Sequence, residues 1–139
     1  PFNFAWTRNK VPVGASRATL TLPNVQKTNA GNYRVVVSNS AGQAISGETQ
    51  LKVLIAPTMF VNPLSRTNVV GSKVTLKAKA KGSPKLGYQW LFNGDPIPLA
   101  IKPKLTLLNA QPGQSGNYSV VVTNAVGTVT SVVAQVVVQ

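Results

Sequence analysis

The chain has 139 residues, and 43% of them are hydrophobic, which is enough for a packed core and too many for a disordered chain. It contains no cysteine and no histidine, which excludes thiol catalysis, disulfides and histidine-dependent chemistry. Fourteen basic residues stand against two acidic ones, and the net charge of +12 favours anionic surfaces or polymers as partners.

Two parts of the chain repeat each other at a spacing of 84 or 85 residues. The stretch AGNYRVVVSNSAG at 30–42 corresponds to SGNYSVVVTNAVG at 115–127, and Trp6 corresponds to Trp90. A period of this length is too long for a solenoid repeat and suits a small all-β domain.

The first unit, predicted over residues 1–55, consists of short strands rich in Val, Thr, Ser and Leu. Its opening residues, PFNFAW, correspond to the third strand of the second unit, and no counterpart of residues 58–84 precedes them. We therefore expect a partial domain that lacks its first two strands. Either the chain is a piece of a longer array, or another chain donates these strands to the open sheet.

The second unit, predicted over residues 56–139, is complete, with about seven strands. In KVTLKAKAKG at 73–82, small or apolar residues alternate with lysine and threonine, which is the period of a half-buried strand. Asn93-Gly94 is typical of a hairpin turn. No stretch has a sustained helical period, so the predicted fold class is all-β.

Four motifs of the second unit follow one another in a characteristic order: GSKVTLKAKAKG, YQWLFNG, LTLLNAQPGQSGNY and YSVVVTNAVG. The last three recur in the first unit as FAWTRN, LTLPNVQKTNAGNY and YRVVVSNSAGQA. This set resembles the immunoglobulin-like family, in a cysteine-free bacterial form of the intermediate set. The resemblance implies two tandem β-sandwiches, of which the first lacks its first two strands.

The resemblance also implies a structural core. In that family a tyrosine near the start of strand F bonds to upstream backbone and lies two residues before a cysteine. Tyr118 matches this tyrosine, so Val120 matches the cysteine and Ala78 matches its partner on strand B. A packed contact would then replace the disulfide. The implied core residues of both units are Trp6, Tyr33, Val35, Ala78, Trp90, Tyr118 and Val120.

Catalysis is not expected from these residues. The two carboxylates, Glu48 and Asp95, occupy unrelated places in the two units, so no paired-carboxylate mechanism is available. The sequence also lacks a glycine-rich phosphate loop and converging calcium ligands. We predict no enzyme activity, no cofactor and no metal site.

Charge in the second unit is confined to its first part: eight basic residues and Asp95 precede Leu105, and no charged residue follows. The resemblance places strands B and E in one sheet, with lysines pointing outward. Two interpretations stay open for this face: a solvated surface that maintains solubility, or contact with an anionic partner such as a polysaccharide or cell envelope. Its predicted residues are Lys73, Lys77, Lys79, Lys81 and Lys104.

The opposite sheet should be neutral, and it is either ordinary surface or a packing face for another domain or subunit. Aromatic residues make up 6% of the chain and fall on core positions, so specific nucleic-acid binding is not expected. No apolar run approaches the ~18 residues of a membrane span. The outward residues of this possible packing face are Gln89, Leu91, Ser119, Val121 and Thr123.

These features favour a non-catalytic structural or adhesive module of a secreted bacterial surface or filament protein, located outside the cell. Its partners would be other domains or subunits of a surface assembly, or anionic envelope polysaccharide. Two alternatives are an accessory binding module of a secreted polysaccharide-active enzyme and a surface domain of a phage virion.

Overall fold

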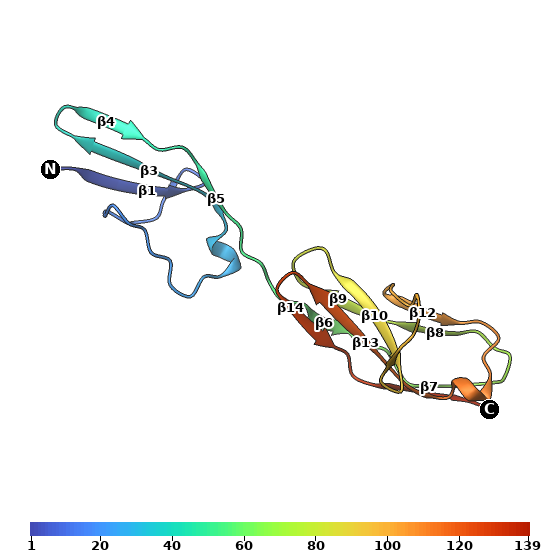
Figure 1. The fold of residues 1–139 in the computed structure, drawn as a ribbon. Helices are drawn as coiled ribbons and strands as arrows, with labels where there is room; N and C mark the ends of the chain where they lie inside the picture. The colour runs from blue at the N-terminus through green and yellow to red at the C-terminus, as the bar shows by residue number, and fades with distance from the viewer. The chain divides into compact units, whose positions relative to one another are not determined.

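The computed structural model describes all residues 1–139 and divides them into two compact units, unit 1 at Pro1–Val53 and unit 2 at Leu54–Gln139. Both consist of β-strands with one short 3-10 turn each and no α-helix (Figure 1), which confirms the all-β fold class. The division falls two residues before the predicted boundary between residues 55 and 56.

Unit 2 is built from two layers of strands. In the larger sheet, in spatial order, lie β11 (Asp95–Pro96), β10 (Gly87–Phe92), β13 (Gly116–Asn124), β15 (Ala134–Val138) and β7 (Arg66–Asn68), with β14 (Gly127–Thr130) also paired to β13. The other layer pairs β12 (Lys104–Leu107) with β8 (Val74–Lys77) and β6 (Thr58–Val61) with β9 (Lys79–Lys81). All pairings are antiparallel except that of β15 with β7.

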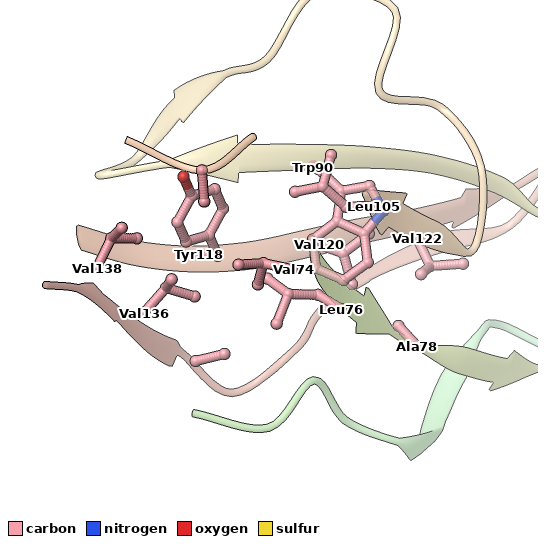
Figure 2. Packing of buried hydrophobic residues seen from close by; sticks show 12 residues of the cluster. Val74, Leu76, Ala78, Trp90, Leu105, Tyr118, Val120, Val122, Val136 and Val138 are labelled. Carbon is pink, nitrogen blue, oxygen red and sulfur yellow. The ribbon is translucent and has the colours of Figure 1, made fainter. Parts of the chain in front are cut away.

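The core of unit 2 lies between these layers, and Figure 2 shows its side chains. Trp90 and Val120 are fully buried, and Ala78 and Tyr118 are nearly so. The indole Nε1 of Trp90 donates a hydrogen bond to the Lys102 carbonyl at 2.8 Å, which satisfies its one polar group. A single apolar cluster thus includes Ala78, Trp90, Tyr118 and Val120.

The predicted tyrosine bond to upstream backbone is present in both units. The Tyr118 hydroxyl donates to the Gln114 carbonyl at 2.8 Å, at the 3-10 turn Pro112–Gln114. In unit 1 the Tyr33 hydroxyl donates to the Asn29 carbonyl at 2.6 Å. Burial raises the pKa of Tyr118, because the charged phenolate would lose its hydration there.

Unit 1 forms one sheet. Its strands, in spatial order, are β2 (Val11–Pro12), β1 (Asn3–Arg8), β3 (Gly31–Asn39) and β4 (Gly42–Ile45), with β5 (Thr49–Leu51) also paired to β3. It has no counterparts of β6 to β9, so the first two strands are absent, as predicted. Trp6 and Val35, which the sequence predicted as core residues, are therefore only half-buried, because no second sheet covers them.

The residues that join the units are held by unit 2. The Asn124 side-chain amide donates to the carbonyls of Ile55 at 2.7 Å and Ser83 at 3.1 Å. A Cβ atom at Gly127 would lie 2.9 Å from the Ala56 side chain, so only glycine leaves room for this segment. These contacts attach Ile55 and Ala56 to unit 2, which begins at Leu54.

Candidate binding surface

The lysine face of unit 2 comprises Lys73, Lys77, Lys79, Lys81 and Lys104. The alternation read from the sequence agrees with the burial of strands β8 and β9, where Val74, Leu76 and Ala78 are buried. The lysines between and beyond them are exposed. Ala78 separates β8 from β9 along the chain. Strand β8 pairs with β12, whereas β9 pairs with β6.

Like charges face each other on this surface. Lys104 of β12 lies directly opposite Lys77 of β8 in the antiparallel register, an arrangement that destabilises a sheet. The one acid of unit 2, Asp95, belongs to β11 in the other sheet. In unit 1, by contrast, the one acid, Glu48, pairs with Arg34 at 3.2 Å. No carboxylate of unit 2 therefore belongs to the strands of the lysine face.

Apolar side chains lie among these lysines. The Lys81 ammonium lies 5.0 Å from the centre of the Phe60 ring, within cation–π range. Val61 is opposite Lys79 in the β6–β9 register. The sequence pattern did not reveal this feature, because the run TMFV and the following residues read equally well as core, and only the structure shows Phe60 exposed.

A hollow of about 140 Å³ continues this apolar area beside β8. Val61, Leu64, Arg66 and Lys77 are among its lining residues, and Leu64 is 68% exposed. Two cationic side chains thus flank an apolar recess. The surface as a whole can bind an anion through its lysines and can bury apolar groups of the same partner.

The predicted packing face requires a correction. Ser119 is only 9% exposed, and it lies opposite Leu91 in the β10–β13 register. Gln89 is half-buried, and its amide is used within unit 2, donating to the main-chain oxygens of Trp90 and Ile97 at 2.9 and 2.8 Å. Thr123 is exposed and Val121 is half-buried. The face therefore offers fewer free side chains than expected.

Glu48 and Asp95, the two acidic residues of the chain, belong to different units. No helix has the length and apolar character needed to cross a bilayer.

Comparisons with known proteins agree with this architecture. Residues 56–124 match the family model described as "Immunoglobulin domain". The chain is 32% identical over 123 residues to muscle M-line assembly protein unc-89 of Caenorhabditis elegans, covering 83% of this chain and 2% of that protein. It is 33% identical over 85 residues to mouse neuronal cell adhesion molecule, covering 61% of this chain and 7% of that protein.

A solved structure of the N-terminal eight immunoglobulin domains of Down syndrome cell adhesion molecule superposes with a TM-score of 0.76 at 24% identity. It covers 100% of this chain and 21% of that one. Across the first curated relatives, this chain spans between 2% and 14% of the relative's length. Residues 56–124 thus match the immunoglobulin-domain family, and the chain folds as tandem immunoglobulin-like domains, the first of them partial.

Proposed function

We propose that the chain is a non-catalytic adhesive segment of an extracellular surface or filament protein, and that its lysine face binds an anionic polymer. Relatives whose names denote cell adhesion and muscle assembly support a structural or adhesive role. Fold alone does not identify a ligand, so the proposal about the partner depends on the surface of unit 2.

The observation that carries the proposal is the cross-strand pair of Lys77 and Lys104. Five exposed lysines without an acidic neighbour raise the electrostatic free energy of the isolated unit, and an anionic partner would lower it. A polymer with regularly spaced anions matches this surface better than a small anion, because the lysines are distributed over three strands, β8, β9 and β12, and over the residue before β8.

The proposal is tested by retention of the full chain on an immobilised acidic polysaccharide, eluted with a salt gradient. The double variant Lys77→Ser/Lys104→Ser should elute at clearly lower salt than the wild type. The matched control is Lys10→Ser/Lys27→Ser, which removes the same charge from unit 1 and should elute close to the wild type.

Equal loss of retention in both double variants would show that only total charge matters, and the proposed face would then be wrong. Unfolding of the variants is not a concern at these positions, because all four side chains are exposed. Removing one of the two facing cations should even raise the stability of unit 2 by about 0.2–1 kcal/mol.

The finer context stays a prediction. Unc-89 and neuronal cell adhesion molecule come from a nematode and a mouse, so they give no support to a bacterial source. The alternatives of an accessory module beside a polysaccharide-active enzyme and of a phage surface domain also remain predictions. The polysaccharide retention test bears on the first of them, because an accessory module would bind the polymer that its enzyme degrades.

A further inference from the structure

The connection between β11 and β12 presents a leucine in a conformation that favours glycine. Leu99 has a φ of 63°, and its side chain is 91% exposed. The left-handed region is unfavourable for a side chain such as leucine, and burial within unit 2 does not compensate for it. Neither local conformation nor the core therefore accounts for a leucine at this place.

Hydrogen bonds to a core residue hold this connection in position. The Trp90 N–H donates to the Ala100 carbonyl at 2.9 Å, and the Ile97 N–H donates to the Trp90 carbonyl at 2.9 Å. The indole Nε1 of Trp90 donates to the Lys102 carbonyl on the other side of Leu99. The leucine is thus presented by a segment that the core tryptophan fixes at three points.

Unit 1 contains a similar but shorter connection, with glycine at the left-handed position. The Trp6 N–H donates to the Ala15 carbonyl at 3.4 Å, and the Val13 N–H donates to the Trp6 carbonyl at 3.0 Å. Between these residues lies Gly14, with a φ of 75°. The connection in unit 2 is one residue longer, because Pro98 and Leu99 lie between Ile97 and Ala100 where unit 1 has Gly14 alone. In each unit one residue of this connection has a left-handed backbone, and in unit 2 that residue is the exposed Leu99.

Strand β12, which comes next along the chain after this connection, has one free edge. Strand β12 pairs with β8 on one side, and no strand pairs with its other side. The Ala78 N–H donates to the Pro103 carbonyl, and main-chain groups alternate along an antiparallel ladder. Leu105 and Leu107 therefore direct their main-chain groups toward β8. The residues that direct theirs outward are Lys104, Thr106 and Leu108.

Apolar and cationic side chains accompany this edge. Ile101 is 60% exposed just before β12, and Leu108 is 72% exposed just after it. Lys102 and Lys104 are exposed between them, and no acidic residue belongs to β8 or β12. The edge thus combines unpaired main-chain groups, projecting apolar residues and positive charge.

We propose that the outer edge of β12, with Leu99, Ile101 and Leu108, is a docking edge for an extended acidic segment of a partner protein. The segment adds as a strand through main-chain hydrogen bonds. Charge favours an acidic partner, because Lys102 and Lys104 attract an acidic strand. A second copy of this chain would bring the same lysines to the interface, and the like charges would repel each other. This inference goes beyond the proposed polymer binding, because it requires main-chain pairing and Leu99.

The test uses the full chain labelled with 15N and a short capped peptide in which glutamate alternates with valine. Amide hydrogen exchange at Lys104, Thr106 and Leu108 should slow by about tenfold or more when the peptide is in excess. Exchange at Leu105 and Leu107 should stay unchanged, because their amides already bond to β8. The control is the same peptide with alternate amides N-methylated, which keeps its charge but cannot pair, and it should give no protection.

Two variants test the edge from the protein side. Leu99→Gly, which removes the exposed side chain and relieves the left-handed backbone, should weaken peptide binding several-fold while the thermal midpoint stays equal or rises. Thr106→Pro removes one outward N–H at an edge position where proline is tolerated, and it should abolish the protection. Unchanged Trp90 emission, recorded in a Trp6→Phe background, would establish that unit 2 of both variants is folded.

Three results would overturn the proposal. The first is absence of protection at the three outward amides in excess peptide. The second is equal binding of the N-methylated peptide, which would leave only charge attraction. The third is protection that appears with rising concentration of the chain alone, which would make a second copy the occupant.

Discussion

Truncation of Val120 should measure how much the buried valine contributes at the position that the sequence resemblance matches to a cysteine. Val120 is fully buried in the core cluster of unit 2. Removing its methyl groups forfeits about 0.8 kcal/mol of transfer free energy for each carbon, and the cavity left behind adds to this loss. We expect Val120→Ala to lower the free energy of unfolding by about 2–3 kcal/mol.

The matched control lies on the same strand. Val121→Ala removes the same atoms and the same β-propensity, but Val121 is only half-buried and does not belong to the core cluster. Its cost should stay below about 1 kcal/mol. The difference between the two variants therefore isolates burial from strand propensity.

The assay is urea unfolding followed by the emission of Trp90, in a Trp6→Phe background so that only unit 2 is observed. Since small domains have m-values of about 1–3 kcal/mol/M in urea, Val120→Ala should lower the midpoint by about 0.7–3 M. Equal shifts for Val120→Ala and Val121→Ala would refute the argument that packing at this position stabilises unit 2.

Three further predictions concern the same unit. Because burial raises the pKa of Tyr118, its contribution to stability is fully present below pH ~10 and is lost as pH rises through the raised pKa. Urea titrations against pH should therefore show a smaller alkaline loss for Tyr118→Phe, which costs about 1 kcal/mol at neutral pH through its lost hydrogen bond. Ala78→Cys with Val120→Cys should form a disulfide worth up to about 4 kcal/mol between oxidised and reduced forms, and free thiols after oxidation would contradict the implied pairing. Asn124→Ala should cost about 2 kcal/mol and speed amide exchange at Ile55 and Ala56, whereas Asn39→Ala should cost less, because the Asn39 side chain bonds only within its own loop.

Much of the fold could be predicted because it depends on short-range patterns. The alternation from Lys73 to Lys81 indicates which side chains turn inward, and the repeated GNY motif locates the tyrosine that bonds to upstream backbone. The partial first unit also follows from alignment of the two repeats. These features need only strand periodicity and turn chemistry, which a single sequence contains.

The surface was harder to predict, because alternation gives the direction of a side chain and not what lies over it. Ser119 points away from the core cluster but is covered, and Gln89 uses its amide inside unit 2. Phe60 reads as a core residue and is exposed. The left-handed backbone of Leu99 could not be predicted from its residue type, since glycine and asparagine are the residues that usually indicate such positions. Gly14 of unit 1 is an example.

The confinement of charge in unit 2 has a consequence for how the protein is handled. All its lysines lie at or before Lys104, whereas Leu105 to Gln139 contain no amine and no trypsin cleavage site. If the protein is coupled to a solid support through its amines, unit 2 will be attached largely through the lysines of the layer of β8, β9 and β12. A sensor chip prepared in this way would bury the lysine face and the edge of β12, so attachment through an introduced C-terminal tag would leave both surfaces open.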